Sequence, residues 1–261
     1  YAEHVAKQGL GCNMITLAGH SQIRADVMGL SQRRPPDGEE MKKIKAHIDE
    51  AFEAGVWGLS TGRDYPPSAY ADFDEIVELA EYVRDLGGYY FTHWRRTGPR
   101  VGTPERPDRL AGITEPLEIA LATGIKTQIS HLATGFEIYP EDSRMDAYAA
   151  RVTLEHIDGY IDRGADVAFD VIPGNSGGIC TTPYLASLFM PWLKEAGSLA
   201  QFIKNLGARD YRERLLALLQ AGEWYAVNPN VCPSWDLKIY ITESSHVEAG
   251  MNIREIARAA G

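Results

Sequence analysis

Two histidines, His93 and His131, end two apolar, strand-like runs, residues 88–93 and 125–131, with one helix-length segment between them. Parallel barrels carry out chemistry at the rim formed by the carboxyl ends of their strands. Zinc binds neutral imidazole nitrogen readily, and a catalytic zinc needs about three protein ligands and one open position. The spacing therefore predicts that both histidines bind a metal. Ordinary core or rim histidines are the alternative.

Three further side chains stand where they could contact a substrate. His20 ends a strand-like run, Asp170 ends another, and Ser176 lies in the glycine-rich residues 174–178. His20 suits hydrogen bonding at least as well as metal binding, and Asp170 could bind metal, orient a substrate or cap the following loop. The glycine-rich residues suit an anion cradle or a plain turn. Nucleotide-binding loops, the GxSxG elbow and HExxH are absent from the sequence.

The segments that must position these side chains alternate between strand-like and helix-like patterns, as in βαβ units. Strands are expected over residues 13–18, 56–62, 88–93, 125–131 and 166–170. Helices are expected over residues 39–54, 72–86, 116–123 and 146–163. The pattern predicts an α/β fold, an incomplete TIM-type (β/α)8 barrel of about five to six parallel strands with a helical insertion near the C-terminus.

The chain is expected to divide into three parts. Residues 1–181 form the partial barrel, and residues 182–222, rich in helix formers and aromatic side chains, form a helical excursion over the rim or a plain helical decoration. Residues 223–261 add a strand over 235–242 and a terminal helix. The chain starts inside a helix-like segment without an initiator methionine, so we expect a piece of a longer protein.

Composition excludes several classes of partner. The 261 residues carry a formal charge of −10, which disfavours nucleic-acid and anionic-membrane surfaces and leaves a small molecule as the expected partner. No apolar run approaches the roughly 18 residues that span a bilayer. The three cysteines are odd in number and form no CxxC pair, which favours a reducing, cytoplasmic location.

Short motifs along nearly the whole chain resemble, in their order and spacing, those of the N-acyl-D-amino-acid deacylases (D-aminoacylases) of the amidohydrolase superfamily. They are GHS at 19–21 with VMG at 27–29, AGVWGLSTG at 54–62, THWR at 92–95, QISH at 128–131, Asp170 with Pro173, and PWL at 191–193. The resemblance implies barrel strands three to seven of that family. It also implies that His93 and His131 bind zinc, one or two ions in the complete enzyme, and that zinc-activated water hydrolyses an amide.

Other parts of the family pattern have no counterpart here. The first-strand HxH or HxD pair, the ligand cysteine and the aspartate general base are missing, and Cys12 is not at a rim position. We therefore expect the general base to lie outside this chain, and the isolated chain to be nearly inactive. Ala133 stands where the family has a lysine, and Arg95, placed with Asp170 near the substrate, could replace that charge, as could Arg96 or Arg100.

Three alternatives stay open. A dihydroorotase-like or hydantoinase-like cyclic amidase would keep both histidines and act on another substrate. A metal-free barrel lyase or aldolase would need a rim group such as Lys126, which lies early in its strand. A catalytically incompetent barrel fragment would bind or assemble, and exposed barrel edges would promote homo-oligomers or strand exchange.

Overall fold

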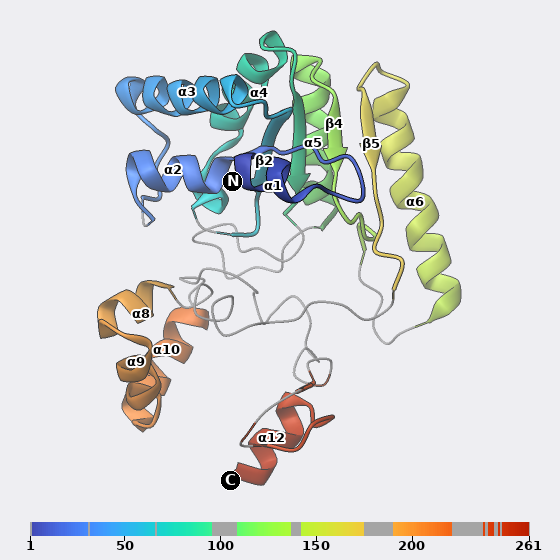
Figure 1. The fold of residues 1–261 in the computed structure, drawn as a ribbon. Coiled ribbons are helices and arrows are strands. Elements are labelled where there is room, and N and C mark those ends of the chain that lie inside the picture. The colour runs from blue at the N-terminus through green and yellow to red at the C-terminus, as the bar shows by residue number, and fades with distance from the viewer. Residues whose placement is uncertain are drawn as a thin grey trace.

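A computed structural model of the chain describes residues 2–30, 32–65, 67–95, 109–136, 142–174, 190–220, 237, 240–242, 245 and 247–260. Five short parallel strands form one sheet in chain order: β1 (Ala18–Gly19), β2 (Gly58–Gly62), β3 (Tyr89–His93), β4 (Thr127–Ile129) and β5 (Val167–Phe169). The predicted α/β fold with a parallel sheet is confirmed (Figure 1).

Helices connect the strands and pack along the sheet (Figure 1). They are α2 (His20–Met28), α3 (Gly38–Glu53), α4 (Phe73–Asp85), α5 (Arg109–Thr123) and α6 (Ser143–Ile161), with a 3₁₀ turn at Ser68–Tyr70. A further helix, α1 (Ala2–Gln8), precedes β1. Asp37, Asp72 and Asp142 cap the N-termini of α3, α4 and α6 by accepting backbone N–H bonds, so these helices begin where their sequences place a capping carboxylate.

The core lies between the helices and one face of the sheet. Tyr90 and Leu59 of the strands pack with Ile44, Ile48, Ile76 and Leu79 of α3 and α4. Strand side chains alternate between faces. In β3 this alternation buries Tyr90 and Thr92 on the helix side and leaves Phe91 and His93 half-buried on the opposite face. His93 therefore stands at a strand end on the face that the helix core does not fill.

The C-terminal part contains four described helices. α8 (Met190–Ala196), α9 (Leu199–Leu206) and α10 (Arg209–Gln220) pack around Trp192, Phe202 and Leu215, and α12 (Ile253–Ala260) follows. Of the strand expected over residues 235–242, the described positions include one antiparallel bridge, Tyr240 with Asn252. None of the described helices is both long and apolar enough to cross a bilayer.

Two expected boundaries differ from the structure. The first strand is short, because only Ala18 and Gly19 pair fully with β2, and His20 begins α2 rather than ending a strand. α5 begins at Arg109, with Pro116 inside it, although we expected a start at Pro116. A Cβ at Gly112 would lie 2.1 Å from the carbonyl oxygen of Arg95, so this unpredicted first half of α5 packs directly on the chain leaving β3.

Candidate metal site

His93 and His131 lie together at the carboxyl ends of β3 and β4. Nδ1 of His93 and Nε2 of His131 are 2.7 Å apart, and the two rings meet edge to face with centroids 4.4 Å apart. His93 is the last residue of β3, while His131 follows β4 by two residues. The backbone pairing continues between them, because Ser130 N–H donates to the carbonyl of Thr92 at 2.9 Å. The structure thus brings the two predicted ligands to one point.

Asp170 holds the backbone that carries His131. One carboxylate oxygen accepts the His131 backbone N–H at 2.6 Å, and the other accepts a bond from the Gln128 side chain at 3.0 Å. His131 has a φ of 41°, in the left-handed region that non-glycine residues rarely adopt. Asp170 therefore lies at the rim, where we predicted it, with both oxygens engaged by β4 and its following turn.

The pair of imidazoles is chemically suited to a divalent cation. Neutral imidazole nitrogens are donors that zinc takes readily, and these two nitrogens face each other across 2.7 Å. The described residues include no cluster of three or more His, Cys, Asp or Glu side chains that could hold a metal. The pair supplies two ligands of the roughly three that a catalytic site needs.

Arg95 is engaged in a buried ion-pair network. Its guanidinium donates to Glu115 and to the backbone carbonyls of Arg63, Ala69 and Ala71. Burial, followed by the neighbouring Arg63, lowers the pKa of Arg95. A cavity of about 650 Å³ is lined by Arg95 and Glu115, whereas neither His93 nor His131 lines it. A direct contact of Arg95 with substrate would require it to exchange some of these bonds.

His20 lies fully buried at the start of α2. Its Nδ1 is 2.8 Å from the Ser68 hydroxyl, and its Nε2 is 3.0 Å from a Glu75 carboxylate oxygen, which also accepts from Arg24. Burial lowers the pKa of His20, so the neutral ring is favoured. Both nitrogens have protein partners, and this placement favours a role in supporting the fold.

Other candidates fall elsewhere. Ser176 lies outside the described residues, as do Arg96 and Arg100. Cys12 is exposed in the loop after α1.

Sequence reasoning missed Asp64, which follows β2 by two residues. Its carboxylate accepts a hydrogen bond from Nε2 of His93 at 3.0 Å, on the side of the ring opposite His131. The only signal available was its position near a strand end, which many turn residues share.

Comparisons with known proteins find deacylases among the proteins similar to this chain. No family model matches the chain. D-aminoacylase from Alcaligenes xylosoxydans xylosoxydans is 34% identical over 119 residues, which are 46% of this chain and 23% of that protein. The N-acyl-D-glutamate deacylase of Bordetella bronchiseptica, solved with zinc and a phosphonate inhibitor, matches with a TM-score of 0.54 and 26% identity over 66% of this chain and 33% of that one.

A crystal structure of D-aminoacylase, described as defining a subset of the amidohydrolases, matches with a TM-score of 0.55 and 27% identity over 67% of this chain and 33% of that one. The chain spans less than a third of the length of the curated deacylases it matches. Over the matched part, the chain is similar in sequence to D-aminoacylases and N-acyl-D-glutamate deacylases, and its parallel sheet with helices is similar to part of the solved D-aminoacylase and deacylase structures.

Proposed function

We propose that this chain is part of a zinc-dependent amidohydrolase that hydrolyses an amide such as an N-acyl-D-amino acid. The convergence of His93 Nδ1 and His131 Nε2 at the ends of neighbouring parallel strands carries the proposal. The similar N-acyl-D-glutamate deacylase holds zinc and a phosphonate that mimics a tetrahedral intermediate. That likeness supports zinc as the metal and an acyl carbon as the point of attack.

The residues of this chain would hold and orient the reacting groups. A divalent ion bound there would polarise the amide carbonyl and lower the pKa of a water molecule. The His93 side chain is 16% exposed, so part of its ring is accessible. Asp170 fixes the turn that presents His131, and the remaining ligands and the general base would come from outside the described residues.

The partner in this proposal is a small-molecule amide. We retain Asp170, Arg95 and Ser176 as candidates for substrate contacts, with Asp170 favoured because it lies beside the backbone of His131. His20 is not retained, because it is fully buried and both of its ring nitrogens have partners within the protein. A cytoplasmic location, favoured by the cysteine usage, belongs to the same proposal.

Metal content tests the proposal most directly. We expect the purified chain to bind zinc in equilibrium dialysis followed by elemental analysis, and a His93→Ala, His131→Ala double variant to lose that zinc, because two of its ligands are gone. A His4→Ala, His47→Ala double variant is the matched control, since both of these histidines are exposed. Equal zinc in all three proteins would remove the metal site.

Ligand binding then separates the substrate classes. N-acetyl-D-amino acids and hydantoins are titrated into the zinc-loaded chain by calorimetry, with the double histidine variant as the blank. We expect the N-acetyl-D-amino acids to give a heat of binding with the zinc-loaded chain and none with the double histidine variant. Binding of hydantoins alone would favour the cyclic amidase.

A further inference from the structure

We propose that Asp64 is a positioning residue that sets the tautomer of His93 and so keeps the lone pair of Nδ1 facing His131. This role rests on the hydrogen bonds of His93 with Asp64 and His131. Its effect on metal binding also rests on the proposed function.

The hydrogen bond between Asp64 and His93 has one sensible direction. The Asp64 side chain is 1% exposed, and its oxygen lies 3.0 Å from Nε2 of His93. With Asp64 ionised, its carboxylate only accepts hydrogen bonds, which places the proton of His93 on Nε2. A neutral imidazole carries one proton, which leaves Nδ1 of His93 as an acceptor. Asp64 therefore presets the nitrogen that faces His131.

The bond between the two histidines then has a defined donor and acceptor. Because Nδ1 of His93 is an acceptor, Nε2 of His131, 2.7 Å away, donates to it. Binding of a cation by both nitrogens then requires His131 to move its proton and leaves the proton of His93 in place. Asp64 thus fixes the tautomer of His93, and only His131 has to change its tautomer when a cation binds.

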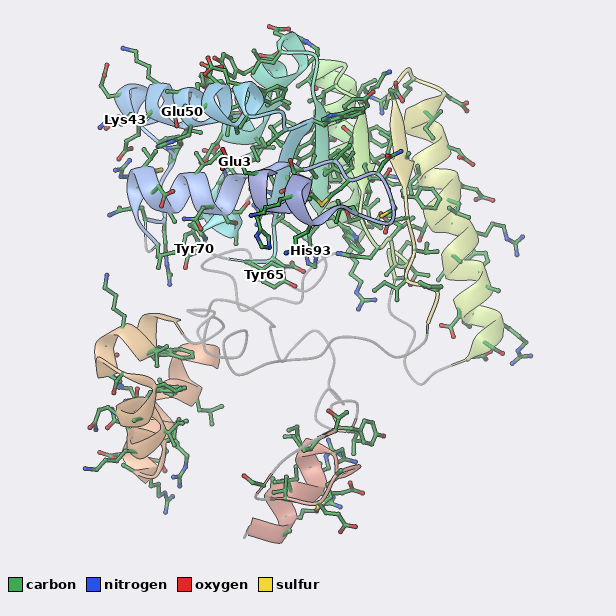
Figure 2. All side chains as sticks on the ribbon, in the orientation of Figure 1. Glu3, Lys43, Glu50, Tyr65, Tyr70 and His93 are labelled. Atoms are coloured by element: carbon green, nitrogen blue, oxygen red, sulfur yellow. The ribbon has the colours of Figure 1, made fainter. Side chains whose placement is uncertain are left out.

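The turn that carries Asp64 is anchored on both sides. Gly62 is the register partner of His93 in the sheet, and Arg63 N–H donates to the His93 carbonyl at 2.8 Å. On the other side, Tyr65 N–H closes the turn on the Gly62 carbonyl at 2.9 Å, and the Tyr65 ring lies 4.8 Å from that of His93. Figure 2 shows Tyr65 and His93 together at one end of the sheet.

A cation bound at Nδ1 of His93 would have an imidazole as its ligand and the Asp64 carboxylate behind that imidazole. Such carboxylates fix the orientation and raise the basicity of a ligating histidine, and their loss commonly weakens metal binding by about 10–100-fold. An amide in place of the carboxylate can donate to Nε2 and stabilise the wrong tautomer. Asp64→Asn is therefore an isosteric change that the proposal predicts to be damaging.

The first experiment reads the tautomer directly. Long-range ¹H–¹⁵N correlation spectra of the metal-free 261-residue chain distinguish Nε2–H from Nδ1–H, with His93 assigned by its absence in His93→Ala. We expect Nε2–H for His93 in the parent chain and a shift toward Nδ1–H in Asp64→Asn. A parent His93 protonated on Nδ1 overturns the proposal, whatever the variants do.

The second experiment measures zinc affinity by competition with a chromophoric chelator. We expect Asp64→Asn and Asp64→Ala to bind zinc about 10–100-fold more weakly than the parent chain. Asp49→Asn is the matched control, because its carboxylate accepts a bond from the Tyr82 hydroxyl at 2.6 Å outside the site, and it should retain parental affinity. Folded Asp64 variants that keep both the tautomer and the affinity of the parent would contradict the role.

The two proposals fail in different ways. A parent chain that binds no zinc removes the proposed function, while the tautomer spectra still decide the role of Asp64. If folded Asp64→Asn keeps the zinc affinity and the His93 tautomer of the parent chain, the metal site stands and the role of Asp64 is removed.

Discussion

His131 combines a ring nitrogen that meets His93 with a backbone that an ordinary residue avoids. Its φ of 41° is the one positive value at a non-glycine position within the described ranges. Such conformations cost about 1–3 kcal/mol and persist where the surroundings impose them. Here the Asp170 carboxylate accepts the His131 N–H at 2.6 Å, and the backbone carbonyl of Asp170 accepts the N–H of Leu132 at 2.7 Å. The position of the His131 ring is therefore maintained at a cost to the stability of the fold.

This strain gives a prediction for substitutions at position 131. Glycine adopts positive φ without a Cβ penalty, so His131→Gly should be more stable than His131→Ala by about 1 kcal/mol. Urea unfolding of the two variants measures the difference.

Lys126 provides the control, since it is exposed and its φ is not positive. At position 126, the Lys126→Gly variant should be less stable than Lys126→Ala. A His131→Ala variant at least as stable as His131→Gly would show that the turn relaxes without strain.

His20 predicts a pH dependence of stability. Burial lowers its pKa from the ordinary 6.5, so unfolding lets the ring take up a proton that the folded chain resists. The stabilisation is complete above pH 6.5 and is lost as the pH falls toward the folded pKa, at up to about 1.4 kcal/mol for each unit between the two values. Urea midpoints measured downward from pH 7 should therefore fall in the parent chain.

His20→Gln should flatten this fall between pH 6.5 and 5, because glutamine does not titrate. Glu75 acts at lower pH: burial alone would raise its pKa, but hydrogen bonds from His20 and Arg24 hold it below 4.5. His47→Gln, at an exposed histidine, should retain the parental profile. An unchanged slope in His20→Gln would assign the pH dependence to other groups.

The histidine pair could be predicted from the sequence, because each member ends a recognisable apolar run that brings it to the same edge of a parallel sheet. Asp64 could not, because its importance depends on the register that sets Gly62 opposite His93. For Arg95, the sequence suggested a role that the fold makes less direct. Its position after β3 suggested a substrate contact, and only the fold reveals Glu115 beside it.

At the scale of elements, a buried Arg63–Glu115–Arg95 network joins α5 to the ends of β2 and β3. Glu115 accepts from Arg63 at 2.6 Å and from Arg95 at 3.1 Å. Burial alone would raise the pKa of Glu115, and the two guanidiniums hold it below its ordinary value. Both arginines also donate to the carbonyl of Ala71, so the network fixes the loop after β2.

Removing the shared carboxylate should be costly. Glu115→Ala leaves two buried guanidiniums without their counter-ion, and we expect a loss of about 3–5 kcal/mol in the free energy of unfolding. Glu118→Ala, at an exposed position one turn along the same helix, should change stability by no more than about 0.5 kcal/mol. Chemical denaturation of both variants measures this. Similar losses of unfolding free energy in the two variants would show that the change in the helix, and not the loss of the ion-pair network, causes the destabilisation.

Element prediction succeeded where local signals agreed with packing. α3, α4 and α6 carry aspartate caps and apolar stripes, and their spans match expectation closely. α2 was missed because its N-cap, Gly19, offers no side-chain bond. The first half of α5 was missed because Pro116, which usually starts or ends a helix, lies inside it, held by packing on β3.

At the scale of the whole chain, the parallel sheet is covered unevenly. Parallel sheets in proteins are normally buried on both faces and closed or protected at their edges. Here the helix core covers one face, whereas no described strand pairs with the outer edge of β1 or β5. Phe169, Val171 and Ile172, at the β5 edge, are 39%, 60% and 54% exposed. The amidohydrolase structures that resemble this sheet are about three times the matched length.

We therefore expect the isolated chain to self-associate through the β5 edge, with a second copy as the occupant, because an unpaired strand beside apolar side chains is a template for pairing. Light scattering and sedimentation should show concentration-dependent oligomers. Val171→Lys with Ile172→Lys should shift the population toward monomer, since charge disfavours edge pairing. Leu154→Lys, at a similarly exposed apolar position on α6, should not. A monomeric parent over the whole concentration range would mean that the chain protects this edge by itself.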